Sequence, residues 1–440
     1  MSSPDRQAAE SRTVLAAAWA RLPSSLRVPT QFLGRHYAGC GATIGAMPKC
    51  DFACTGCYLG EDANRAKPLP LDAVFAQLRD LRRWLGPAGN VQITDGEVTL
   101  RPEGELIALI RHAREIGLVP MLMTHGETFR RKPGLLERLM VEGGLTEVSI
   151  HVDTTQRGRR DRFALARTEA ELDPLRAEFG ARIRDARRKT GRRLEAASTV
   201  TVTRDNLDGV PGIVLWFLAN ADAFKMVSFQ PLADVGRTES HLRGVHPDEL
   251  WRKIAEGAGD PALGRGEGYL GHPACSRFVQ GLAARRNQTT HPRFVPLYQN
   301  NNPREMRMLN GVLDRIGGES FRLDDASARL RRSVRLALRH GGFALTHLLP
   351  HAIRLWRRAG TFRVNYFCIV SHHFMSAEEL AKPLGRERVD SCAFKVPVNG
   401  RLESMCAVNA LGLREQVYRS ASESRPVAMR RATESLPVIA

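Results

Sequence analysis

The stretch KCDFACTGCYLG, residues 49–60, places three cysteines within eight positions, and a tyrosine follows the third. Cys50, Cys54 and Cys57 have the spacing C-x3-C-x2-C. Structural zinc sites use four ligands, commonly in paired C-x2-C units, so these cysteines alone do not complete one. Three thiolates suit a cubane iron–sulfur cluster that keeps one iron without a protein ligand. The alternative is a four-cysteine site completed by Cys40, which nine residues separate from Cys50.

Short apolar runs of strand length alternate with helix-like segments over the first half of the chain. The runs are rich in Val, Ile, Met and Thr, which favour strands. Strands that alternate with helices indicate parallel βαβ units. Six units predict the fold class α/β, a partial (βα)6 TIM-like barrel with a C-terminal cysteine-containing α+β extension. The predicted strands are 43–48, 91–94, 119–124, 147–153, 198–203 and 225–232.

Polar residues follow the apolar runs, at the positions where a parallel barrel carries its chemistry. Any one of them alone is also a good helix N-cap, which is the simpler explanation for a single residue. Together with the cysteine stretch they meet at one rim of the predicted barrel, which favours a shared site. They are Asp95, Gly96, Glu97, Thr124, His125, Asp153, Thr203, Arg204, Asn206 and Gln230.

The cysteine spacing inside a (βα)6 pattern, over residues 43 to about 232, resembles the radical S-adenosylmethionine (radical SAM) superfamily. The resemblance implies a 4Fe-4S cluster on Cys50, Cys54 and Cys57 whose open iron binds S-adenosylmethionine. It implies reductive cleavage of S-adenosylmethionine to a 5′-deoxyadenosyl radical, which abstracts hydrogen from a substrate. In such enzymes the cofactor supplies the chemistry, and the protein supplies position and exclusion of water. A reducing partner such as a flavodoxin or ferredoxin is implied as well.

Further family motifs can be placed on this sequence. The second-strand motif, typically Gly-Gly-Glu-Pro, corresponds to residues 95–98, where Gly96 and Glu97 match. The third-strand Thr-Asn-Gly corresponds to residues 124–126, and the fifth-strand motif to residues 203–206. Gly56 stands where relatives often have an aromatic residue. The resemblance thus implies that S-adenosylmethionine is held by Asp95, Gly96, Glu97, Thr124, Asp153, Thr203, Arg204, Asn206 and Gln230. His125, His372 and His373 are candidates for a catalytic role.

Four more cysteines, Cys275, Cys368, Cys392 and Cys406, follow the predicted barrel, and four is a full set for an auxiliary iron–sulfur cluster. Asn399-Gly400, between Cys392 and Cys406, is a strong hairpin signal that brings both thiols to one end. The segment resembles half of an auxiliary-cluster module of the SPASM or twitch type. Buried cysteines that only fill space, or a structural zinc, are the alternatives.

The net charge of +18 implies an anionic partner or a solvated basic surface. Residues 321–363 contain ten arginines and two aspartates, with apolar stripes beside arginine stripes. This pattern predicts basic amphipathic helices over 321–360 that lie on an anionic membrane surface. The alternative is a helix packed on the barrel with a solvated basic face. No run of 18 apolar residues is present, so we expect a cytoplasmic protein, peripheral to the inner face of the membrane.

The expected function is radical SAM chemistry on a lipid or membrane-associated substrate. A peptide-modifying enzyme is the second candidate. A non-catalytic metal protein that binds nucleic acid is the third, and it is disfavoured because aromatic residues for base stacking make up only 6% of the chain. The expected organisation is an N-terminal helical segment (1–30), the radical SAM barrel (31–260), a bridging region (261–320), basic helices (321–360), an auxiliary cluster module (361–420) and a polar tail (421–440).

Overall fold

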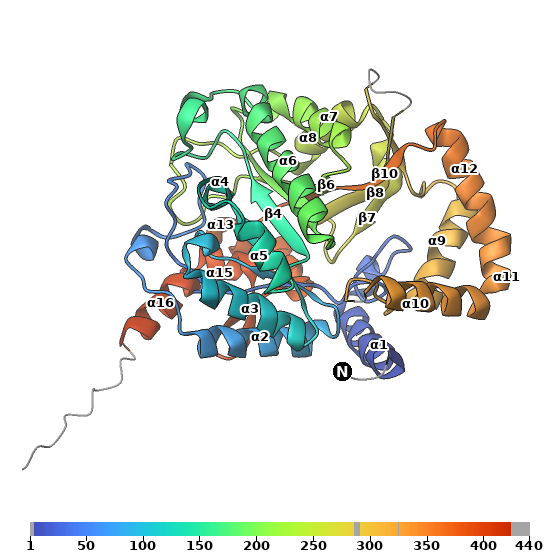
Figure 1. The fold of residues 1–440 in the computed structure, drawn as a ribbon, viewed down its shortest axis with the longest axis horizontal. Coiled ribbons are helices and arrows are strands. Elements are labelled where there is room, and N and C mark those ends of the chain that lie inside the picture. Colours follow the sequence, from blue (N-terminus) through green and yellow to red (C-terminus); the bar gives the residue numbers. More distant parts are fainter. Residues whose placement is uncertain (1–3, 286–290, 324, 424–440) are drawn as a thin grey trace, which may run out of the picture.

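Six parallel strands form the centre of the protein (Figure 1). The computed structural model describes residues 4–285, 291–323 and 325–423. The strands pair consecutively and in parallel, which confirms a half-barrel of βα units. They are β1 (Cys40–Ala42), β2 (Asn90–Ile93), β3 (Val119–Thr124), β4 (Glu147–His151), β5 (Glu195–Val202) and β6 (Phe224–Pro231).

The first strand is Cys40–Ala42 and lies before the predicted range 43–48, which was wrong, and two side chains explain the difference. The main chain of Ile44, in the predicted strand 43–48, donates to and accepts from the side chain of Gln77 at 2.9 Å each. The amide of Gly45 donates to the carboxylate of Asp95. Because side chains satisfy these backbone groups, the segment does not continue the strand ladder.

Strands from the second half of the chain extend this sheet at both edges. β10 (Val364–His372) runs parallel to β6, and β11 (Phe394–Val398) runs parallel to β1. β7 (Glu267–Tyr269), β8 (Ser276–Ala284), β9 (Arg293–Pro296) and β12 (Arg401–Ser404) pair antiparallel at the outside. The twelve-stranded sheet has the order β12-β11-β1-β2-β3-β4-β5-β6-β10-β8-β7, with β9 on β8. The C-terminal extension is therefore continuous with the barrel sheet.

The hairpin predicted at Asn399-Gly400 is confirmed. Both residues have positive φ, 48° and 77°, as a two-residue hairpin turn with the twist of its strands requires. The turn joins β11 to β12, which pair from Lys395 with Ser404 to Val398 with Arg401.

Amphipathic helices cover the outer face of the half-barrel and bury the main core. On α3 (Glu103–Glu115), Leu106, Leu109 and Ile110 are 0–1% exposed and share a cluster with Ile93 and Leu122 of the strands. Burial of each such side chain stabilises the fold by about 1.5–3 kcal/mol. The other covering helices are α2 (Leu71–Leu85), α4 (Glu127–Arg131), α5 (Leu135–Val141), α6 (Asp173–Thr190), α7 (Val210–Ala219) and α8 (Pro247–Ala258).

Helices of the termini and of the extension flank the sheet. α16 (Leu413–Glu423) is the last described element, so the predicted tail 421–440 lies mostly outside the described residues. The others are α1 (Pro4–Arg21), α9 (Pro303–Ile316), α13 (Ala377–Ala381), α14 (Pro383–Asp390) and α15 (Met405–Ala410).

The predicted basic helices form one continuous arm at the edge of the molecule (Figure 1). The arm consists of α10 (Ala326–Arg339), α11 (Gly341–Phe343), the π-helical segment Ala344–Leu348 and α12 (Leu349–Ala359). In α10, none of the described side chains is buried. Among the helices of the described residues, none combines the length and the apolar composition that a membrane crossing needs.

Candidate active site at the cysteine loop

The loop with Cys50, Cys54 and Cys57 is fixed to the loops that follow β4 and β6. The amides of Ala53 and Thr55 donate to carbonyl oxygens of residues 157 and 155 at 2.8 and 2.9 Å. From the other side, the amide of Arg237 donates to the carbonyl of Cys57 at 3.0 Å. The three thiols thus lie at the carboxyl ends of the strands, where parallel half-barrels carry their chemistry.

The charge balance of this loop fits a bound metal cluster. Burial raises the pKa of the Cys54 thiol, and the neighbouring Cys57 and Cys50 raise it further. Three thiolates at this spacing repel one another unless a cation compensates them. Burial alone lowers the pKa of Arg237, but Cys57, Cys50 and Cys54 raise it overall, and its buried Nε has no hydrogen-bond partner among the described residues. A thiolate-bound cluster is therefore compatible with this donor set.

Gly96 and Glu97 hold the cysteine loop against β2. The amide of Gly96 donates to the carbonyl of Met47 at 2.7 Å, and the amide of Glu97 donates to that of Lys49 at 2.8 Å. A Cβ at position 96 would collide with the carbonyl oxygens of Pro48 and Lys49, so this close approach requires glycine.

The carboxylate of Glu97 ties the loop after β2 to the end of β3. One oxygen accepts from the hydroxyl of Thr124 at 2.6 Å, and the other accepts from the amide of His125 at 2.9 Å. Glu97 is 1% exposed, so both predicted loops are fixed by one buried acid.

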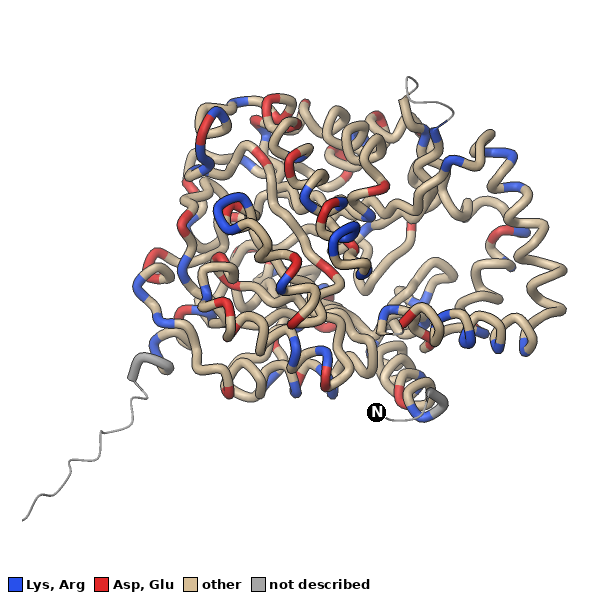
Figure 2. Tube along the Cα trace, viewed as in Figure 1, with Lys and Arg blue, Asp and Glu red and all other residues tan. Residues whose placement is uncertain are grey.

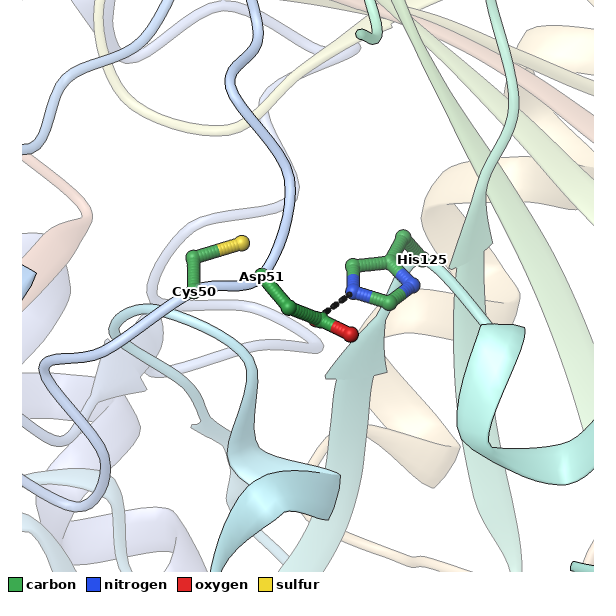
Figure 3. A group of neighbouring side chains, drawn as sticks. All are labelled: Cys50, Asp51 and His125. Atoms are coloured by element: carbon green, nitrogen blue, oxygen red, sulfur yellow. Dashed lines mark hydrogen bonds and ion pairs between the residues drawn. The ribbon is translucent and has the colours of Figure 1, made fainter. Parts of the chain in front are cut away.

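His125 lies beside the first cysteine (Figure 3). Its Nε2 is 2.8 Å from Asp51, and its ring stacks on Phe52 with centroids 3.8 Å apart. Burial alone would lower the pKa of His125, but Glu97, Asp51 and Cys50 raise it to about 10. The ligand atoms of Cys50, Asp51 and His125 lie within 4.8 Å of one another, a group that can also hold a single metal ion.

Asp95 has a different position from the one its motif implies. Its carboxylate accepts from the amide of Gly45, from Tyr418 at 2.7 Å and from Arg414. All these donors belong to the protein, and the carboxylate is 0% exposed. Asp95 therefore anchors the C-terminal helix α16, and its oxygens are taken up by that anchor.

The predicted residues at the ends of β4, β5 and β6 differ in their surroundings. Asp153 is fully buried and accepts from the amides of Thr155 and Thr201 at 2.9 and 2.6 Å, which joins β4 to β5. Asn206 accepts from the amide of Thr203 at 2.8 Å, which shapes the turn after β5. Arg204 turns away and pairs with Glu249 of α8 at 2.6 Å, and Gln230 is half-buried on β6.

Three of the four later cysteines, Cys275, Cys392 and Cys406, interact electrostatically in the extension. Burial raises the pKa of Cys406 to about 12, and the nearby thiols of Cys392 and Cys275 contribute to the rise. The Nε of Arg388 donates to the sulfur of Cys275 at 3.2 Å. Arg388 is 3% exposed, so this positive charge is buried beside the thiol of Cys275.

Cys368 lies in a different environment. It belongs to an apolar cluster with Phe32 and Phe278 and is 8% exposed. Of the two histidines after it, His373 pairs with Glu379 at 3.3 Å. Burial lowers the pKa of His372 to about 4. Cys368 thus packs in an apolar cluster, whereas Cys275, Cys392 and Cys406 influence one another electrostatically.

The sequence does not point to three arginines of these sites, Arg237, Arg388 and Arg414. Lys and Arg together number 65, and no local pattern distinguishes these three. Gly236 precedes Arg237 in the chain. Its φ of 60° and its close approach to Tyr58 place Arg237 against the cysteine loop.

Comparison with known families agrees with the half-barrel and its cysteine loop. Residues 44–177 match the Radical SAM superfamily model. The matched residues include the three-cysteine loop and strands β2 to β4. No curated protein matches the chain significantly.

Similar solved structures include two proteins with low identity to this chain. Streptococcus suis SuiB is 16% identical, with a TM-score of 0.36 over 49% of this chain and 44% of that one. The anSMEcpe structure with bound AdoMet and Cp18Cys peptide is 14% identical, with a TM-score of 0.35 over 49% of this chain and 57% of that one. The chain spans about half the length of these structures, and at such scores they say nothing of its substrate.

Proposed function

We propose that the protein is a radical SAM enzyme that cleaves S-adenosylmethionine reductively and abstracts hydrogen from a substrate at the inner face of the half-barrel. The observation that carries this proposal is the cysteine loop itself. Three thiols, one half-buried arginine and the Gly96-Glu97 backbone meet at the carboxyl ends of the strands.

Each part of the site has a role in the proposal. Cys50, Cys54 and Cys57 would hold the cluster, and Arg237 would balance its negative charge. The backbone at Gly96 would face the amino acid end of S-adenosylmethionine, while Glu97 keeps the neighbouring loop in place. When bound, the cluster and S-adenosylmethionine supply one-electron chemistry that removes a hydrogen atom.

We place the substrate on the inner face of the sheet. Residues that pair across parallel strands point to the same side, and alternate residues point to opposite sides. Ile93, Leu122 and Val148 face the helices and are 0% exposed. Some of the alternate positions, such as Met123 and Gln230, are half-buried although they lie on central strands. Their accessible surface supports a substrate-binding inner face.

We also propose a second metal site, formed by Cys275, Cys392 and Cys406 with Arg388 beside it. A thiolate site needs counter-charge when it is buried, which Arg388 and a metal would supply together. An auxiliary iron–sulfur cluster is the candidate group. Cys368 is left out of this ligand set because it packs in an apolar cluster.

For the substrate, we propose a lipid or membrane-associated molecule, with a modified peptide as the second candidate. The exposed apolar side chains of the arm favour the lipid or membrane-associated substrate. A flavodoxin or ferredoxin is the proposed electron donor. We propose a cytoplasmic position at the membrane because thiols stay reduced in the cytoplasm.

The proposal is tested by anaerobic reconstitution with iron, sulfide, reductant and S-adenosylmethionine. We expect 5′-deoxyadenosine to accumulate in the wild type. A Cys54→Ala variant should form none, while Cys40→Ala, which tests the alternative fourth ligand, should retain the reaction. Absence of 5′-deoxyadenosine from a wild type with an intact cluster would refute the proposal.

A further inference from the structure

The arm α10–α12 presents a row of large apolar side chains to solvent. On α10, Leu330, Val334 and Leu338 are 66%, 50% and 81% exposed. Exposed positions of the following segment are Leu345, Leu349, Ile353 and Trp356, at 68%, 54%, 41% and 45%. A single exposed leucine needs no explanation, but a contiguous apolar stripe on a helix marks an interaction surface.

The apolar face points outward because the other face of the arm is tied to the body. The Nε2 of His351 is 2.7 Å from the carbonyl of Leu297, and Arg358 pairs with the buried Glu305 at 3.2 Å. Phe343 packs on Gly311 of α9, and the guanidinium of Arg315 lies over its ring at 4.4 Å. These contacts fix the orientation of α11 and α12, and Arg332 ties α10 to Glu319 at 3.4 Å, so the exposed stripe is a built feature of the fold.

Arginines line the same face. Arg331, Arg335 and Arg339 border a shallow hollow of about 710 Å³ together with the three exposed apolar side chains of α10. Neither α10 nor α12 contains an acidic residue, and Figure 2 shows their basic residues along the arm. Residues 321–363 carry ten arginines against two aspartates, a net charge of 10 − 2 = +8. Two copies of this face would repel each other, so self-association is disfavoured.

We infer that the outer face of α10–α12 binds the surface of an anionic phospholipid membrane, with the arm lying in the plane of the headgroups. Apolar side chains of such a helix enter the boundary between headgroups and acyl chains to about 5–10 Å, while arginines pair with phosphates. On α10, arginines and exposed apolar side chains line the same hollow. This inference rests on the surface alone and does not require the proposed reaction.

The test is flotation of the full-length protein with vesicles. One set consists of phosphatidylcholine alone, and the other contains phosphatidylglycerol in addition. We expect the wild type to float with the anionic vesicles and to stay behind with the neutral ones. Each arginine near an anionic surface contributes about fivefold to binding, so Arg331→Gln/Arg339→Gln should weaken it by about 25-fold.

The apolar contribution is tested with Leu338→Ser/Leu345→Ser, whose exposed positions leave the core intact. We expect its partition into anionic vesicles to fall by about tenfold or more. The matched control is Leu165→Ser, because Leu165 is 84% exposed on the separate segment Asp161–Leu165. This variant should bind as the wild type does.

Three results would overturn the inference. The first is equal recovery with neutral and anionic vesicles, and the second is undiminished binding by both arm variants. The third is a concentration-dependent dimer, seen by light scattering without lipid, that Leu338→Ser/Leu345→Ser dissolves. That result would assign the face to a second copy of the chain. Production of 5′-deoxyadenosine is measured separately, so failure of membrane binding and failure of the proposed reaction are distinguishable.

Discussion

Arg414 of the C-terminal helix α16 forms a buried ion pair with Asp95, which follows β2. The two side chains are 1% and 0% exposed, and 318 residues of chain separate them. Tyr418 of the same helix also donates to Asp95, and Arg414 lies over the ring of Tyr58 at 4.7 Å. The end of the chain is thus tied to the tyrosine directly after the third cysteine of the loop.

The first prediction concerns the stability that this ion pair contributes. Arg414→Ala leaves the Asp95 carboxylate buried without its partner, and we expect a loss of about 3–5 kcal/mol in the free energy of unfolding. The measurement is denaturant unfolding followed by circular dichroism. An Asp95→Asn/Arg414→Leu double variant, which removes both charges, should recover most of the loss.

An exposed pair supplies the control for that experiment. Arg65 and Asp62 are 86% and 75% exposed, so Arg65→Ala should cost no more than about 1 kcal/mol. Equal effects of Arg65→Ala and Arg414→Ala would show that the buried pair has no special role.

The second prediction concerns Arg237. Arg237→Gln removes the positive charge beside the three thiols, so the reduced, more negative cluster is disfavoured. We expect a lower reduction potential with nearly unchanged iron content, measured by redox titration of the reconstituted protein. Arg237→Lys should restore part of the potential because it keeps the charge. Identical potentials in all three proteins would contradict this role.

The third prediction concerns Gly96. Gly96→Ala places a Cβ against the carbonyl oxygens of Pro48 and Lys49, which pushes the cysteine loop away from β2. We expect formation of 5′-deoxyadenosine to fall by about 100-fold, because small displacements of reacting groups have effects of that size. Gly104→Ala is the control, since no atom lies within 4 Å of its added Cβ. The assay is product formation at saturating S-adenosylmethionine.

The fourth prediction separates the later cysteines. Cys392→Ala should lose the second metal site, about four irons per chain for a cubane, while the first cluster remains. Cys368→Ala should keep the full iron content, because Cys368 packs in an apolar cluster. Iron and sulfide analysis of both variants decides the matter. If the two variants lose iron equally, the three-cysteine ligand set is wrong.

The features that the sequence predicts are local ones. The cysteine spacing, the apolar runs of β2 to β6 and the Asn399-Gly400 turn depend on residues close in the chain, and each appears in the structure. Hydrophobic periodicity and turn chemistry act over a few residues, which is why they can be read directly.

The features that the sequence does not predict depend on distant partners. Asp95 stands in a motif that suggests a cofactor contact, yet its partner Arg414 comes from the other end of the chain. The proposed grouping of Cys275 with Cys392 and Cys406, without Cys368, depends on the placement of β8, β10 and β11 in one sheet. Periodicity shows that α10 is amphipathic, but only its tertiary contacts decide which face points outward.

The most direct test of the central claim is electron paramagnetic resonance of the reduced protein with and without S-adenosylmethionine. The claim is that Cys50, Cys54 and Cys57 hold a cluster with one open iron. We predict that S-adenosylmethionine changes the signal of the wild type and of Cys392→Ala, and that the Cys50/Cys54/Cys57→Ala variant lacks the responsive signal. A cluster signal that S-adenosylmethionine leaves unchanged, or a responsive signal that survives loss of the three cysteines, would contradict the account.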